Sequence, residues 1–263
     1  MMNLMRADMY RILRGKAVYI SLAVMVLLAA LVVFVFRIAP ATGIITEEDV
    51  FVPVAENYMT GAMGAELAIG GMNNIAFIFL VGIVVTAMAA FSSGAVKNEL
   101  TIGIGRTKFY FSKWLLTCLL SISAMLIFLA MFIIFATFVD GFGYWGDGYL
   151  AEVLTSFGLQ SILAIAFSSI GVFFSFVTRK AAAVNGLYIA FMLVPTFIIA
   201  LLAEAFPRAM DFVVYDMSFL FGVFATAANQ PTADIVRGVI IGLGYILVST
   251  VAGVLLFRKA EIR

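Results

Sequence analysis

Histidine is absent from the 263 residues, and Cys118 is the only cysteine. These absences exclude an intrachain disulfide, a cysteine zinc cluster, Ser-His and Cys-His nucleophile pairs and the HExxH metal-binding helix. Charge is also scarce, at 12% of the residues, whereas globular proteins average roughly 25%. Hydrophobic residues make up 64% of the chain. This composition predicts a polytopic membrane protein.

The long apolar runs predict an all-α integral membrane protein with six transmembrane helices, because a crossing helix needs about 20 mostly apolar residues. The predicted spans are residues 17–36, 72–93, 113–139, 151–177, 181–203 and 238–257. No stretch between them is long enough to bury a core of its own, so we expect residues 1–263 to form one transmembrane domain. The first run is too long for the apolar core of a cleavable signal peptide, and we therefore expect none.

An apolar stripe at helical spacing precedes the first span. It consists of Met5, Met9, Ile12 and Leu13, with basic residues between them. Such a stripe with basic flanks predicts a helix over residues 2–16 that lies in the cytoplasmic interface of the membrane. The alternative is a basic anchor without fixed structure.

Residues 204–237 are the ambiguous part of the chain. Residues 212–228 are apolar, but this run has only 17 residues and contains Asp216. A carboxylate in mid-membrane costs about 2.5–3.5 kcal/mol, and a seventh crossing would move the basic C-terminal tail to the other side. We therefore predict a re-entrant or outer-leaflet helical hairpin over 204–237 that returns to the side from which it entered.

The charge distribution predicts the orientation. The predicted segments place 13 of the 16 basic residues on one side of the membrane and 12 of the 15 acidic residues on the other. The positive-inside rule then assigns both termini to the cytoplasm. The acidic residues of the first outside segment are Glu47, Glu48, Asp49, Glu56 and Glu66. They fit either the ordinary charge asymmetry of membrane proteins or an attraction for cationic peptides.

None of the predicted spans carries a charged residue in its middle. Transporters driven by ion gradients and many intramembrane enzymes need ionisable residues at that depth, so the pattern disfavours both classes. Residues 103–106 (GIGR) superficially suggest a phosphate loop, but they lack the GxxxxGK[ST] pattern. We therefore expect no nucleotide, cofactor or metal to bind to this chain, and no catalytic residue in it.

The loop between the second and third spans, residues 94–112, is short and basic. Residues 98–104 can form two helical turns, with Gly94 before them and Gly103 and Gly105 at their end, where glycine permits sharp turns. Two interpretations remain open from these residues. The loop is either a rigid element on which a soluble partner pushes, or only a positively charged determinant of topology.

This loop resembles the corresponding loop of ABC-2 type permeases of Gram-positive bacteria, the membrane subunits of exporters that include lantibiotic-immunity and bacitracin-type systems. Their pattern runs Gly-x-Ile-Arg-Asn-Lys-Ile, then Gly-x-Ser-Arg, then Tyr-x-Ser-Lys. The matching positions here are Gly94, Val96, Lys97, Asn98, Leu100, Gly103, Arg106, Tyr110, Ser112 and Lys113. The chain departs at Glu99, where the family usually has Lys, and at Gly105, where it has Ser. The resemblance extends to the N-terminal helix, the six spans, the hairpin and the basic tail.

The resemblance implies that the loop is a coupling helix that docks on a separate ABC ATPase subunit. The implied ATPase-coupling residues are Lys97, Asn98, Glu99, Leu100, Thr101, Gly103, Gly105 and Arg106. It also implies a second permease chain, identical or similar, with ATP and Mg bound by the ATPase partner. The expected setting is the bacterial plasma membrane, where the chain contacts lipid and no nucleic acid.

The resulting prediction is the permease subunit of an ATP-driven exporter of a peptide or another amphipathic substrate, as in antimicrobial peptide resistance. A non-transporting immunity or sensor protein that binds a peptide at its acidic extracellular face is the alternative. A self-contained intramembrane enzyme is disfavoured by the missing histidines and the absence of deep acidic pairs. An ATPase gene in the same operon would favour the exporter over the sensor.

Overall fold

The computed structural model describes residues 2–38, 44–45, 51–52, 59–92 and 94–259. Four of the predicted outside acids, Glu47, Glu48, Asp49 and Glu56, and the last four residues of the basic tail lie outside these ranges.

Nearly all of the described chain is helical, with one short antiparallel β-ribbon. The elements are α1 (Met2–Arg14), α2 (Lys16–Ile38), β1 (Ile44–Ile45), β2 (Phe51–Val52), α3 (Gly61–Gly71), η1 (Met72–Ile75), α4 (Ala76–Ile83), η2 (Val84–Met88), α5 (Ala89–Ser92), α6 (Ala95–Thr101), α7 (Arg106–Asp140), α8 (Tyr149–Thr178), α9 (Ala181–Ala205), η3 (Pro207–Tyr215), α10 (Met217–Ala225), η4 (Ala227–Asn229) and α11 (Thr232–Lys259).

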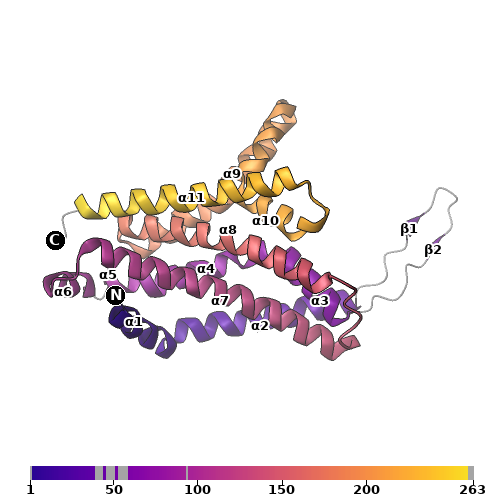
Figure 1. Cartoon of the computed structure of the whole chain (residues 1–263), viewed down its shortest axis with the longest axis horizontal. Coiled ribbons are helices and arrows are strands. Elements are labelled where there is room, and N and C mark those ends of the chain that lie inside the picture. Colours follow the sequence, from indigo (N-terminus) through magenta and orange to yellow (C-terminus); the bar gives the residue numbers. More distant parts are fainter. Residues whose placement is uncertain (1, 39–43, 46–50, 53–58, 93, 260–263) are drawn as a thin grey trace.

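Within the described residues, six segments are long and apolar enough to cross a membrane. They are α2, the continuous segment from α3 to α5, α7, α8, α9 and α11. The predicted all-α fold with six candidate spans is confirmed. Figure 1 shows α1, α6 and the C-terminal end of α11 at one end of the bundle, and β1, β2 and the start of α3 at the other. Which end faces the cytoplasm stays a prediction.

The second long segment differs from the predicted span, because its helix begins at Gly61 rather than Met72. The Thr60 hydroxyl caps it by accepting a hydrogen bond from the Met63 backbone N–H, which satisfies one of the free donors at a helix start. Glu66 does not interrupt the helix, since its side chain lies on an exposed face. The segment then tightens into a 3₁₀ turn at η1 and widens into a π-helical turn at η2.

The segment between α9 and α11 consists of η3, α10 and η4. The nine residues of α10 rise only about 14 Å, whereas a bilayer core is about 30 Å thick. Asp216 begins α10 and accepts hydrogen bonds from the Ser218 backbone N–H at 3.0 Å and from the Thr196 hydroxyl. These two donors explain how a carboxylate can lie among apolar residues, because each offsets part of its desolvation cost.

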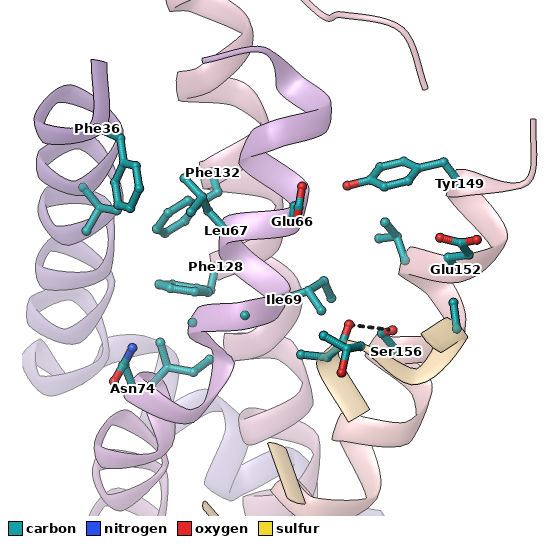
Figure 2. Close-up of a pocket in the computed structure, with 18 of the residues that line it drawn as sticks. Phe36, Glu66, Leu67, Ile69, Asn74, Phe128, Phe132, Tyr149, Glu152 and Ser156 are labelled. Carbon is teal, nitrogen blue, oxygen red and sulfur yellow. Dashed lines mark hydrogen bonds between the residues drawn. The ribbon is translucent and has the colours of Figure 1, made fainter. Parts of the chain in front are cut away.

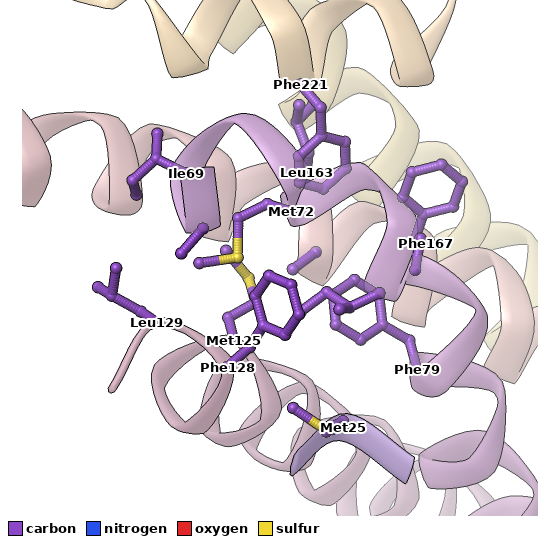
Figure 3. Packing of buried hydrophobic residues seen from close by; sticks show 14 of the residues in the cluster. Met25, Ile69, Met72, Phe79, Met125, Phe128, Leu129, Leu163, Phe167 and Phe221 are labelled. Carbon is purple, nitrogen blue, oxygen red and sulfur yellow. The ribbon is translucent and has the colours of Figure 1, made fainter. Parts of the chain in front are cut away.

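The main core forms around the segment from α3 to α4, which contacts α2, α7, α8 and α10. Figure 3 shows the side chains that fill it, including Met72, Phe79, Met125 and Phe167. All four are at most 1% exposed. This core fixes α3 and α7 relative to α8, and these helices form most of the outer cavity described below.

Candidate coupling site and outer cavity

The helix α6 lies within the predicted coupling loop but begins and ends about three residues earlier than predicted. Gly94 precedes it with a φ of 69°, and Gly103 follows it with a φ of 93°. The Ile104 N–H donates to the Glu99 carbonyl at 3.3 Å, the six-to-one hydrogen bond of a Schellman ending. Because Gly103 occupies the left-handed position of that ending, the helix stops at Thr101.

The apolar side of α6 is anchored to a cluster of aromatic side chains. This inner aromatic cluster consists of Phe109, Tyr110, Phe176 and Phe257, from α7, α8 and α11. Its ring centroids lie 4.6 to 5.9 Å apart, a range typical of favourable aromatic pairs. Val96 of α6 is buried against the cluster at 3% exposure. Val96 thus places α6 in contact with a cluster that three long helices share.

Arg106, a predicted coupling residue, lies at the start of α7 and bonds within the chain. Its guanidinium donates to the Arg258 carbonyl at 2.6 Å and to the Phe257 carbonyl at 3.4 Å. These carbonyls belong to the last turn of α11, where backbone acceptors lack helical partners and a cation is favourable. Arg106 thus holds the base of the loop against α11.

Asp8 of α1 and Lys113 of α7 form a buried ion pair. The Lys113 ammonium donates to the Asp8 carboxylate at 2.5 Å, and these side chains are 0% and 5% exposed. Arg11 contacts the other carboxylate oxygen at 3.0 Å. The sequence pattern gives no signal for this pair, because 105 positions separate the two residues.

Glu99 of α6 lies within electrostatic range of this pair. Its charge interacts with Lys113, Asp8 and Arg11, and its Oε2 is buried without a hydrogen-bond partner among the described residues. Burial raises the pKa of the Glu99 carboxyl above its ordinary value; Lys113 and Arg11 lower that pKa, and Asp8 raises it. Glu99, one of the two departures from the family pattern, therefore lies within electrostatic range of charged groups on α1 and α7.

The raised pKa gives Glu99 a predictable effect on stability. The folded chain holds the Glu99 proton more tightly than the unfolded chain, so this residue contributes stability that is lost as pH rises through its folded pKa. We expect Glu99→Gln to be nearly neutral at low pH and to stabilise the chain relative to wild type as pH rises to about 7. Thermal unfolding in detergent across this range measures the difference. The raised pKa of Glu99 would be contradicted if the stability difference between Glu99→Gln and wild type did not depend on pH. It would also be contradicted if Asp147→Asn, in the exposed turn before α8, gave the same difference.

The other predicted coupling residues lie as follows: Lys97, Asn98 and Leu100 within α6, Thr101 at its end, Gly103 in its terminating turn and Gly105 just before α7.

Ile102 was not among the predicted coupling residues, but its side chain is 81% exposed at the tip of the loop. The available signal was a large apolar residue within a basic polar loop. Such a residue is a candidate contact for a partner, although single exposed apolar residues are common on surfaces.

The second candidate site is a cavity of about 850 Å³ near the opposite end of the bundle. We call it the outer cavity, because the predicted orientation places this end of the bundle outside the cell. Figure 2 shows it across the exposed face of α3, with Phe36, Phe128 and Phe132 on one side and Tyr149 and Glu152 on the other. The remaining lining residues are Leu28, Val32, Glu66, Leu67, Ile69, Gly70, Gly71, Asn74, Ile75, Val153, Ser156, Ala225, Thr226, Ala228 and Asn229. No motif or spacing in the sequence indicates this cavity.

Two hydroxyl groups of the cavity already have hydrogen-bond partners, whereas its two carboxylates have no salt-bridge partner among the described residues. The Tyr149 hydroxyl donates to the Ala62 carbonyl at 3.0 Å, and the Ser156 hydroxyl donates to the Ala225 carbonyl at 3.3 Å. Glu66 and Glu152 are exposed to the cavity region, and neither forms a salt bridge with another described residue. The cavity therefore presents two carboxylates that have no cationic partner within the described part of the chain.

Among the described residues, no group of three acidic or thiol side chains is placed so that it could hold a metal ion. The chain offers no histidine as a general base. The two candidate sites are thus the loop helix α6 at one end of the bundle and the cavity near the other.

Comparison with protein families gives one informative result. The sequence model of the ABC-2 family transporter protein matches residues 4–195. A search of curated proteins finds no match. The matched region covers well over half of the chain, from α1 into α9, and includes α6 together with the Asp8–Lys113 pair. The chain therefore belongs to the ABC-2 family and is its membrane-embedded permease domain.

Proposed function

We propose that this permease is driven by a separate ABC ATPase that docks on α6, and that it exports a peptide or another amphipathic substrate across the bacterial plasma membrane. ATP and Mg would be bound by the ATPase subunit. The observation that carries the proposal is α6 itself: a short helix closed by two glycines of positive φ, with Ile102 exposed at its tip.

The contacts of α6 support a role in transmitting force. Val96 packs on the inner aromatic cluster, and Glu99 interacts with Lys113 of α7 and Asp8 of α1. A push on the exposed side of α6 therefore reaches α7, α8 and α11 through the contact of Val96 with the inner aromatic cluster, on which Leu4 of α1 also packs. Close-packed interiors transmit such displacements because they have little free volume.

Glu99 differs from the family pattern, and this difference affects which part of α6 the ATPase contacts. The family usually has a lysine at this position, whereas here a carboxylate interacts with Lys113 inside the chain. We infer that the carboxylate at position 99 responds mainly to charges inside the chain. The ATPase then contacts mainly the tip around Thr101 and Ile102, and both of these side chains are exposed.

The proposed transporter contains two permease chains, identical or similar. The outer half of α9 leans away from the bundle in Figure 1. Its apolar side chains are widely exposed, for example Leu193 at 53%, Phe197 at 70% and Leu201 at 60%. This helix offers a surface on which a second chain can pack, in addition to its contact with lipid.

The test is reconstitution. The chain is co-expressed with a candidate ABC ATPase, purified, and placed in liposomes with a fluorescent cationic peptide as the probe. We expect the complex to hydrolyse ATP and to move the peptide only when ATP is present, whereas the isolated chain does neither. A chain that binds the peptide but recruits no ATPase would instead be the sensor or immunity protein. ATP hydrolysis by the isolated chain would also contradict the proposal.

A further inference from the structure

The outer cavity extends deep into the membrane region. Leu28 lines it, and this residue lies ten positions before the end of α2 at Ile38. At the helical rise of 1.5 Å per residue this is a depth of about 15 Å, half of a bilayer core of about 30 Å. A ligand in this cavity is therefore held partly within the hydrocarbon layer.

The two sides of the cavity differ in character. One side is formed by apolar residues of α2 and α7, among them Val32, Phe128 and Phe132. The other contains Glu66 of α3 and Glu152 of α8, and Figure 2 shows Glu66 facing Tyr149 and Glu152. The asymmetry matches a molecule that has an apolar body and a cationic group at one end.

The floor of the cavity is one face of the segment from α3 to η1. Glu66, Gly70 and Asn74 line it at intervals of four residues, which places them on the same side of the helix. A Cβ atom at Gly70 would have no neighbouring atom within 4 Å. The missing side chain at Gly70 therefore leaves open space within the cavity and is not required by close helix packing.

We propose that this cavity binds a small amphipathic amine, with its ammonium group at Glu66 and Glu152 and its apolar body against Val32, Phe128 and Phe132. The proposal rests on the proposed function, since it assigns a substrate class to the exporter. The volume of about 850 Å³ lies within the roughly 300–1,000 Å³ range of pockets that enclose drug-sized ligands. It accommodates a small molecule entirely.

Charge determines the selectivity that we expect. Two carboxylates beside low-dielectric apolar walls attract a cation more strongly than they would in bulk water. An anionic ligand of the same shape meets repulsion from both carboxylates. A neutral ligand gains only the apolar contacts. Hydrogen bonds to ionised groups predict a preference of about tenfold or more for the amine over its neutral analogue.

The experiment is a fluorescence titration of the full chain in nanodiscs of neutral phosphatidylcholine, without any ATPase. The probe is a dansyl-labelled alkylamine, compared with its N-acetyl derivative and with a carboxylate of the same length, each corrected for binding to empty nanodiscs. We expect the amine to bind about tenfold more tightly than the acetylated probe. The carboxylate should bind more weakly than either.

Two variants test the assignment of the site. Glu66→Gln combined with Glu152→Gln should abolish the preference for the amine while retaining the binding of the acetylated probe. Gly70→Phe should weaken the binding of the amine and the acetylated probe, because the ring fills the cavity. Unfolding temperatures identify any variant that fails to fold.

Two matched controls accompany them. Glu204→Gln removes an exposed carboxylate at the end of α9, outside the cavity. Gly158→Phe adds a ring to α8 at an open glycine that lies about 200° around the helix from Ser156. Both should bind the amine like wild type. The proposal would be overturned if the wild-type chain bound the amine and the acetylated probe equally, or if Gly70→Phe bound them as wild type does. Neither result would affect the proposed docking of an ATPase on α6.

Discussion

Asp8→Asn is expected to reduce the free energy of unfolding by about 3–5 kcal/mol, the usual cost of removing one partner from a buried ion pair. The substitution keeps the shape of the side chain and removes its negative charge. The ammonium of Lys113, which is 0% exposed, then loses its only salt-bridge partner among the described residues. Unfolding of the purified chain in mixed micelles with increasing SDS, followed by tryptophan fluorescence, measures the change.

Substitution of Asp8 and substitution of Lys113 should reduce the free energy of unfolding by different amounts. Lys113→Met leaves Asp8 with Arg11 at 3.0 Å, so its carboxylate retains a cation and the loss should be smaller than for Asp8→Asn. The double variant Asp8→Asn with Lys113→Met removes both charges and should recover most of the stability, because an uncharged pair no longer has a buried charge to desolvate.

An exposed pair on α11 serves as the control for this series. Arg237 and Asp234 are 3.1 Å apart, but their side chains are 50% and 39% exposed. Arg237→Met should therefore cost less than about 1 kcal/mol. If Asp8→Asn cost no more than this control, the Asp8–Lys113 contact would not be a buried structural pair, and it would not link α1 to α7.

Hydropathy was sufficient to predict most of the fold. The first span was predicted at 17–36, and α2 extends over Lys16–Ile38, because only a continuous apolar run satisfies both backbone and side chains in a bilayer. Hydropathy did not locate the start of the second long helix. That start depends on the Thr60 cap and on contacts of α3 with α7, which a count of apolar residues does not include.

The coupling loop could be predicted from local signals, whereas its linkage to the rest of the chain could not. Glycines on both sides of a short polar run indicated a bounded helix, and Gly94 and Gly103 adopt the positive φ that only glycine readily accepts. The environment of Glu99 depends on Asp8 and Lys113, which come from other elements. The outer cavity was missed for the same reason, since its walls combine residues of α2, α3, α7, α8 and η4.

Ile102→Asp is expected to weaken the binding of the ATPase about 10- to 100-fold. A fully buried isoleucine contributes about 1.5–3 kcal/mol, which corresponds to this range of Kd. The aspartate loses that contribution and adds the cost of desolvating a carboxylate at the interface. Because Ile102 is 81% exposed in the free chain, the substitution removes few internal contacts and should leave the unfolding temperature unchanged. Titration of the purified ATPase against the chain in nanodiscs measures Kd.

Two further variants separate docking from a general effect of added charge. Tyr144→Asp changes a side chain of similar exposure, 85%, in the turn at the opposite end of the bundle, and should bind the ATPase like wild type. Ile102→Val keeps a branched apolar side chain and should retain most of the affinity. If Ile102→Asp bound as tightly as Tyr144→Asp, the tip of α6 would not be the contact. The force from ATP hydrolysis would then have to enter the permease through another part of the inner surface, and the connections of α6 to α1 and to the inner aromatic cluster would have only a structural role.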